Sequence, residues 1–203
     1  MDASDQSEPA RTAAAELARL ERLLRNIDIG YEEFSFLYRN GEVTDVLRAT
    51  AEGFFRITFN VMLDWLILQL GKLHKSSQER AVTLESALER LKEAGVSDAD
   101  LAEARTHARM FAKQYQQYKA FRDRAIAHMD WQMPKGDIGL ELEPLIDTAR
   151  QCVNEMKAVA GLGATALSEL PPAMNYRAPH LIALLSGRMG ELNEQGSLGG
   201  SMD

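Results

Sequence analysis

The amino-acid sequence predicts an all-α protein, most simply a helical bundle of four to five main helices with a short extra helix and a C-terminal extension. Apolar residues recur at steps of three and four positions in several long segments, as they do along one face of a helix. Proline and glycine cluster between these segments, and no run alternates apolar and polar residues as a half-buried strand would. With 203 residues, of which 45% are hydrophobic, the chain is long enough to bury one core.

The expected helices divide the chain into three regions. Residues 1–11 are polar and acidic, and we expect them to be disordered. Residues 12–160 are expected to form the helical bundle, and residues 161–203 the extension. The N-terminus lacks the basic start and apolar block of a signal peptide, so secretion is not expected.

A first helix is expected to begin near Thr12. Its apolar stripe has helical spacing and comprises Leu17, Leu20, Leu24 and Ile27. The following segment, residues 28–42, interrupts this pattern, and Gly30 with the Asn40-Gly41 pair is interpreted as a set of helix breakers. We therefore expect a connection with one short helical turn in this segment.

A long second helix is expected from Thr44, as its N-cap, to about Leu73. Its middle is apolar on nearly all sides, which is typical of a helix surrounded by other helices. The most apolar run, residues 59–71, carries Asp64 and Gln69 and falls short of the roughly 20 apolar residues of a membrane span. We therefore interpret it as a core helix and expect no membrane contact.

Further helices follow along the chain. A shorter one lies within residues 81–95 and ends at a glycine, and Ser97 caps the next, which covers residues 98–128. Proline and glycine residues break the chain after it, and the last strong helix lies within residues 142–161. A short amphipathic helix around residues 179–192 completes the prediction.

Cysteine content and charge narrow the classes of function. The single Cys152 has no disulfide partner within the chain, which fits a reducing compartment, so we expect a cytoplasmic protein. A net charge of −7 argues against a protein that coats nucleic acid by bulk electrostatics. However, residues 105–128 hold six basic residues against one acidic residue, a local net charge of +5. The basic residues are Arg105, Arg109, Lys113, Lys119, Arg122 and Arg124.

The sequence shows no pattern of a metalloenzyme, kinase or hydrolase. It has no metal-ligand spacing of Asp, Glu and His, no glycine-rich phosphate loop and no Gly-x-Ser-x-Gly turn. His107 and His128 lie about 30 Å apart on a continuous helix and cannot share a metal ion. His74 and His180 are expected on the surface, and Cys152 is expected to be buried and inert. We therefore predict no metal ion and no cofactor.

The stretch AFRDRAIAHMDW, residues 120–131, combines charged residues with small apolar neighbours at the end of the basic helix. Arg124 and His128 lie one turn apart on the same face, and Arg122 is displaced by about 120° around the axis. One interpretation is a helix C-terminus, where basic residues complement the helix dipole. The other is a ribonuclease site, because an imidazole can deprotonate the ribose 2′-hydroxyl while a guanidinium neutralises the phosphate.

With this motif the sequence resembles the HEPN domains, the helical superfamily whose ribonucleases carry an arginine, a polar residue directly after it, and a histidine four to six residues beyond the arginine. Arg122, Asp123 and His128 match this pattern. The AH.D ending at residues 127–130 resembles in particular the abortive-infection, AbiU-like branch, as do the segments MLDWLILQLGKL and VTLESAL. The resemblance covers roughly residues 12–160.

The resemblance implies a symmetric homodimer in which two such motifs face each other across the interface. It assigns His128 as base or acid, Arg122 to the phosphate and Asp123 to the orientation of its neighbours, with no metal ion and a 2′,3′-cyclic phosphate product. It also implies an RNA substrate, a role as toxin or phage-defence effector, and an antitoxin protein as a partner. The candidate RNA-binding residues on the basic helix are Arg105, Arg109, Lys113 and Lys119.

Two points stay open on the sequence alone. Arg124 competes with Arg122 as the arginine of the site. The chain is alternatively a non-catalytic dimeric helical module that binds a protein partner or a nucleotide, or a plain structural bundle whose motif caps a helix.

Overall fold

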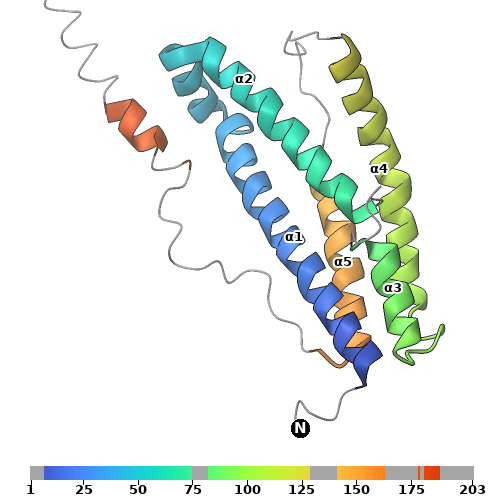
Figure 1. Cartoon of the computed structure of the whole chain (residues 1–203). Coiled ribbons are helices and arrows are strands. Elements are labelled where there is room, and N and C mark those ends of the chain that lie inside the picture. The colour runs from blue at the N-terminus through green and yellow to red at the C-terminus, as the bar shows by residue number, and fades with distance from the viewer. Residues whose placement is uncertain (1–6, 75–81, 129–140, 163–177, 179–180, 188–203) are drawn as a thin grey trace, which may run out of the picture. The chain divides into compact units, whose positions relative to one another are not determined.

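Figure 1 shows the computed structural model of the chain, which describes residues 7–74, 82–128, 141–162, 178 and 181–187, without the side chains of residues 121–128. The main helices are α1 (Glu8–Tyr38), α2 (Gly41–His74), α3 (Leu84–Glu93), α4 (Ala102–His128) and α5 (Glu143–Val159). Residues 181–187 are also helical. These described residues include no strand, which confirms the all-α class.

The chain divides into two compact units, and the division falls within α1 and α2. Unit 1 comprises residues 1–28 and 64–168, and unit 2 comprises residues 29–63 and 169–203. Each unit has buried apolar residues of its own. The expected division into a bundle over residues 12–160 and an extension stays a prediction.

In unit 1, α4 packs along α5, and α3 packs against both helices. A capping box starts α3: the Ser86 N–H donates to the Thr83 hydroxyl at 3.1 Å, and the Thr83 N–H donates to the Ser86 hydroxyl at 2.9 Å. The largest fully buried side chains of this unit are Leu17, Leu20, Leu24, Ile27, Leu66, Ile67, Leu70, Leu73, Leu91, Leu101 and Phe111. The stripe predicted for the first helix is therefore confirmed as part of the core.

Helix α1 is longer than the sequence pattern predicts. It begins at Glu8, ahead of the expected start, and continues to Tyr38 through the segment expected to be a connection. Gly30 costs a helix about 1 kcal/mol relative to alanine. Phe34 and Leu37 lie beyond it and are buried, and burial of each contributes about 1.5–3 kcal/mol. The interpretation of Gly30 as a helix breaker is wrong because this burial outweighs its cost.

Asn40, and not Thr44, caps the start of α2. The backbone N–H groups of Glu42 and Val43 donate to the side-chain oxygen of Asn40, at 3.2 and 3.4 Å. Thr44 lies inside the helix, and its hydroxyl donates to the backbone oxygen of Asn40 at 2.9 Å. The predicted N-cap is therefore wrong. Farther along, α2 kinks at Ala51, where the backbone leaves helical geometry (φ −162°, ψ 70°).

Unit 2 has a separate cluster of buried residues. Its members are Leu37, Val43, Leu47, Phe55 and Ala178. Three aromatic rings of this unit contact one another, with ring centroids 5.1–5.5 Å apart. They belong to Phe34, Tyr38 and Phe59, which lie close in sequence to residues of the cluster. The backbone N–H of Ala178 donates to the Glu33 carboxylate at 2.6 Å, which joins residue 178 to α1.

One face of α2 is exposed. Its apolar side chains are Phe54 (64% exposed), Ile57 (54%), Val61 (57%), Trp65 (39%) and Leu68 (48%). The opposite face, with Leu63, Leu66 and Leu70, is buried. The prediction of a helix enclosed on nearly all sides is therefore wrong for the exposed face. Among the described helices, α2 is long and apolar enough to cross a membrane, by criteria that the core helix of a soluble protein also meets.

Candidate functional site

Helix α4 carries the predicted catalytic motif. Its backbone is helical as far as His128, so Arg122, Asp123, Arg124 and His128 occupy its last two turns. The side chains at these positions lie outside the described residues. The structure therefore places the motif on the helix and leaves the predicted roles of the four side chains as predictions.

Positions 122 and 124, the two candidate arginine positions of the motif, fall on different faces of α4. Phe111 and Tyr115 lie on the buried face of α4. Position 122 follows Tyr115 by seven residues and falls on the same face, at about 100° per residue, whereas position 124 falls about 180° away. His128 follows Arg124 by four residues, so these two positions share the face opposite Tyr115.

Three of the four predicted RNA-binding residues are exposed on α4. Arg109 and Lys113 lie one turn apart, on the face that also holds position 124. Lys119 is exposed as well, at about 120° around the axis from Lys113. The exposed basic residues therefore do not form a single row, and Arg109 with Lys113 continues the face of Arg124.

Arg105, the fourth predicted RNA-binding residue, is held in ion pairs. Its guanidinium lies 3.0 Å from a carboxylate oxygen of Asp98 and 3.5 Å from one of Glu89. A hydrogen bond from Lys92, together with the charge of Arg105, lowers the pKa of Asp98 below its usual range. Asp98 is therefore ionised at neutral pH, and Arg105 is less available to a phosphate than Arg109.

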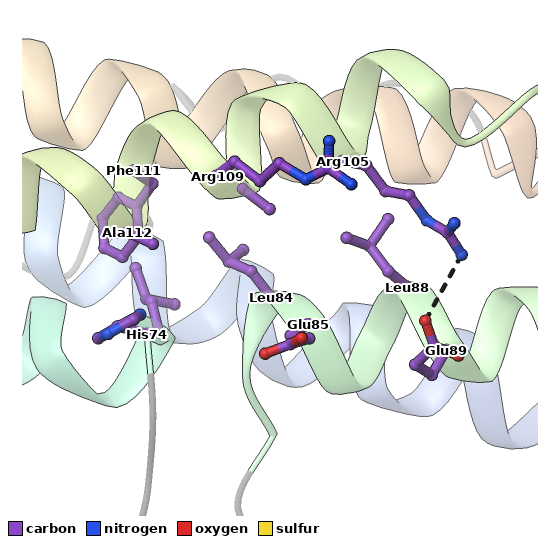
Figure 2. Close-up of a pocket in the computed structure, with 11 residues that line it drawn as sticks. His74, Leu84, Glu85, Leu88, Glu89, Arg105, Arg109, Phe111 and Ala112 are labelled. Atoms are coloured by element: carbon purple, nitrogen blue, oxygen red, sulfur yellow. Dashed lines mark hydrogen bonds and ion pairs between the residues drawn. The ribbon is translucent and has the colours of Figure 1, made fainter.

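A cavity of about 290 Å³ lies within unit 1 among the end of α2, α3 and α4 (Figure 2). Leu84 and Leu88 point from α3 toward α4 (Figure 2). The lining residues are Leu73, His74, Leu84, Glu85, Leu88, Glu89, Arg105, Ala108, Arg109, Phe111 and Ala112. Two carboxylates accompany the two guanidinium groups, so the lining is balanced in charge and does not form a dedicated anion site.

His74 occupies a different environment from the surface loop that the sequence predicts. It is the last residue of α2 and is half-buried. Its Nε2 lies 3.1 Å from the side-chain nitrogen of Gln116, and its ring lies 5.5 Å from the ring of Tyr115. The sequence does not predict this environment, because the polar residues that follow His74 are typical of a loop.

The contact between α4 and α5 includes two further groups that the sequence singles out. His107 Nδ1 lies 3.1 Å from a carboxylate oxygen of Glu155. The thiol of Cys152 donates to the backbone oxygen of Ala104 at 3.2 Å, and burial raises its pKa to about 12. The prediction of a buried Cys152 is confirmed, and its thiol stays protonated at neutral pH.

The sequence predicts no metal site, and the structure describes three of the four histidines, His74, His107 and His128, the last without its side chain. Across residues that the structure describes, no group of three or more His, Cys, Asp or Glu is placed to hold a metal ion. His180 lies outside those residues. The end of α4 stays the candidate site that the sequence predicts, on a backbone that is helical as far as His128.

Comparison with known proteins identifies the family of the chain. No curated protein and no solved structure matches it. A family model described as HEPN_AbiU2 (AbiU2) matches residues 13–170, which is more than half of the chain and includes the whole of α2, α3, α4 and α5. This match confirms the resemblance based on the motif in α4. The chain belongs to the AbiU2 family of HEPN domains.

Proposed function

We propose that this protein is a metal-independent endoribonuclease of HEPN type that acts as a toxin or phage-defence effector in the cytoplasm. The observation that carries the proposal is the position of Arg122, Asp123 and His128 on the last two turns of a basic helix in an AbiU2 chain. Two copies form a homodimer that brings two motifs to one composite site. An antitoxin protein is a further partner.

The reaction needs a general base, a general acid and a cationic group that stabilises the negative charge on the phosphate. His128 removes the proton of the ribose 2′-hydroxyl, and the 2′-oxygen attacks the adjacent phosphorus. The bond from phosphorus to the 5′-oxygen breaks, and His128 of the partner subunit protonates the leaving oxygen. Arg122 stabilises the negative charge that develops on the phosphate, and Asp123 orients its neighbours. The products end in a 2′,3′-cyclic phosphate and a 5′-hydroxyl.

Exposed basic residues on α4 guide the RNA to this site. Arg109 and Lys113 lie on one face, Lys119 lies on another, and Arg105 contributes less because it is paired with acidic residues. The net charge of −7 opposes binding elsewhere on the chain. The substrate is therefore a short or structured RNA that contacts α4 locally, and its binding weakens as the salt concentration rises.

The test is RNA cleavage by the purified full chain in EDTA, with the 2′,3′-cyclic phosphate end measured directly. We expect His128→Ala to lower the cleavage rate on the order of 100-fold or more, because a general base contributes that much. His107→Ala is the matched control, since His107 lies on the same helix and contacts Glu155. Unchanged cleavage by the His128→Ala variant would refute the mechanism.

A second candidate is a non-catalytic dimeric helical module that binds a protein partner or a nucleotide. The exposed apolar face of α2 favours it, because exposed apolar faces of this kind mark protein interfaces. A folded dimer that cleaves no RNA tested and causes no toxicity on expression would support this candidate over the ribonuclease.

A further inference from the structure

The cavity among the end of α2, α3 and α4 lies entirely within unit 1, and apolar residues line it from all three helices. Ala108 and Ala112 lie one turn apart on α4, where their small side chains leave space open. Leu84 and Leu88 point toward α4 from the other side (Figure 2). The volume is about 290 Å³, and a cavity of about 150 Å³ already holds a benzene ring, so the two fused rings of a purine have room here.

One carboxylate and one guanidinium group of the lining are available to a ligand. Arg105 and Glu89 lie 3.5 Å apart and pair with each other. Glu85 on α3 and Arg109 on α4 are exposed, and among the described residues neither takes part in a hydrogen bond or an ion pair. The apolar part of the cavity is therefore accompanied by one hydrogen-bond acceptor and one cation, which come from two different helices.

We infer that this cavity binds a guanine nucleotide, with the base between α3 and α4, its Watson–Crick edge on Glu85 and its phosphate on Arg109. The inference rests on the proposed function, because it takes this nucleotide to be part of the RNA substrate. The cavity then determines which base the substrate carries at a distance from the cleaved bond.

The carboxylate of Glu85 favours guanine over the other bases. An ionised carboxylate accepts hydrogen bonds through both oxygens and donates none. Guanine presents two neighbouring donors at its Watson–Crick edge, the N1–H and the N2 amino group, whereas adenine, cytosine and uracil each place an acceptor beside the donor. Guanine is therefore the base that pairs with both carboxylate oxygens, and unpaired bases of RNA are commonly recognised at this edge.

The placement of the two charged groups favours a nucleotide over a free amino acid. Glu85 and Arg109 lie on separate helices and form no ion pair with each other. An amino acid carries its ammonium and carboxylate groups on one carbon, whereas a nucleotide separates its base from its phosphate by a ribose. Lys113 is exposed one turn beyond Arg109, so it offers a second phosphate contact to a strand that continues along α4.

The length of α4 determines where this guanine lies in the substrate. His128 follows Arg109 by 19 residues, which is about 28 Å along the helix at a rise of about 1.5 Å per residue. A stacked strand rises about 3.4 Å per nucleotide, so the guanine lies about eight nucleotides from the cleaved bond. An RNA too short to reach both places should show no preference for guanine.

Binding of free nucleotides tests the cavity separately from cleavage. In isothermal titration calorimetry with the full chain, we expect GMP to bind about 10-fold or more tighter than AMP, CMP or UMP. Glu85→Gln should remove this preference and improve binding of AMP, because an amide donates and accepts and so pairs with adenine at two atoms. Glu103→Gln is the matched control, since Glu103 is exposed on α4 outside the lining. Equal binding of the four nucleotides, or the same loss in both variants, would overturn the inference.

Two further variants test the phosphate contact and the space for the base. Arg109→Ala should weaken GMP binding about 10-fold and leave guanosine, which has no phosphate, unchanged. Arg19→Ala is its control, because Arg19 is an exposed arginine of α1 outside the lining. Ala112→Leu fills the cavity and should abolish binding of both compounds, while urea denaturation shows that the chain still folds. Binding of GMP that survives this filling would overturn the inference, as would binding of phenylalanine in place of GMP.

Cleavage of RNA separates the inference from the proposed function. In an otherwise all-uracil RNA, one guanine should raise kcat/KM for cleavage about eight nucleotides away, and Glu85→Gln should abolish this effect. A chain that binds GMP through Glu85 but cleaves no RNA would refute the ribonuclease and keep the cavity as a nucleotide site. Cleavage that neither guanine nor Glu85→Gln affects would refute the role of the cavity and keep the enzyme. GMP that guanine-containing RNA does not displace would assign the cavity to a free nucleotide instead of the substrate.

Discussion

The hydroxyl of Tyr115 on α4 occupies the space that a Cβ atom at Gly71 of α2 would need. The ring carbon that carries this hydroxyl would lie 3.0 Å from such a Cβ, closer than van der Waals contact. Within unit 1, the last turns of α2 therefore approach α4 closely because position 71 has no side chain. The same tyrosine ring lies 5.5 Å from the ring of His74, at the end of α2.

Replacing Gly71 should therefore destabilise the protein. We expect Gly71→Ala to lower the free energy of unfolding by about 1–3 kcal/mol, the cost of overpacking a well-packed site. Gly53→Ala, in the same helix with nothing within 4 Å of the added Cβ, should raise it by about 0.5–1 kcal/mol through helix propensity. Urea denaturation of both variants measures the difference. Stabilisation of the same size in both would contradict the close approach.

The buried ion pair between α5 and α1 should contribute to the stability of the folded protein. Lys157 Nζ lies 3.1 Å from Glu21 Oε1, with the lysine side chain 6% exposed. Lys157→Met should lower the free energy of unfolding by about 3 kcal/mol, because it removes the ammonium group that pairs with the Glu21 carboxylate in a poorly solvated place. Replacing both residues, Lys157→Met with Glu21→Leu, should recover at least half of that loss.

An exposed pair provides the comparison for this measurement. Arg48 and Asp45 lie 3.6 Å apart, with side chains 61 and 79% exposed. Arg48→Ala should change the free energy of unfolding by less than about 1 kcal/mol, since solvent screens such pairs. An effect of Lys157→Met that is no larger than this would show that the buried pair contributes little.

Tyr38 should make stability depend on pH in the alkaline range. Its hydroxyl donates to the backbone oxygen of Phe55 at 3.1 Å, and burial raises its pKa from 10.0 to about 12. Between pH 10.0 and about 12, the Tyr38 hydroxyl therefore keeps its proton in the folded state and loses it in the unfolded state. The stabilisation is complete below pH 10 and is lost as the pH rises through about 12.

Tyr38→Phe isolates this contribution. The difference in free energy of unfolding between the unaltered protein and the variant should decrease steadily as the pH rises from 10 toward 12, as followed by denaturant titration at each pH. A difference that is independent of pH would show that the Tyr38 hydroxyl ionises equally in both states.

The two arginines of the motif should have separable roles. We expect Arg122→Ala to lower kcat on the order of 100-fold, because Arg122 stabilises charge at the phosphate in the transition state. Arg124→Ala should mainly raise KM and reduce the salt dependence of binding, because its position continues the face of Arg109 and Lys113. Steady-state cleavage at several salt concentrations measures both effects. The reverse pattern would assign Arg124 to the site.

The sequence by itself determined the fold class, the family and the position of the motif. These depend on local patterns: the three- and four-residue spacing of apolar side chains sets helices, and the residues from Arg122 to His128 are neighbours along the chain. It also identified Cys152 as buried, because Cys152 belongs to the apolar stripe of α5. Each of these predictions depends on patterns within segments of the chain and needs no knowledge of what lies opposite them.

The tertiary structure decided which apolar faces are covered and which charges are paired. Gly30 lies inside α1 because buried side chains beyond it outweigh its cost, and Arg105 is held by Asp98 and Glu89 from elsewhere in the chain. The apolar residues around Val61 look alike in the sequence, yet one side of α2 is buried and the other is exposed. Burial and ion pairing depend on residues distant in sequence, so the pattern of one helix predicts that it has an apolar face but not what covers that face.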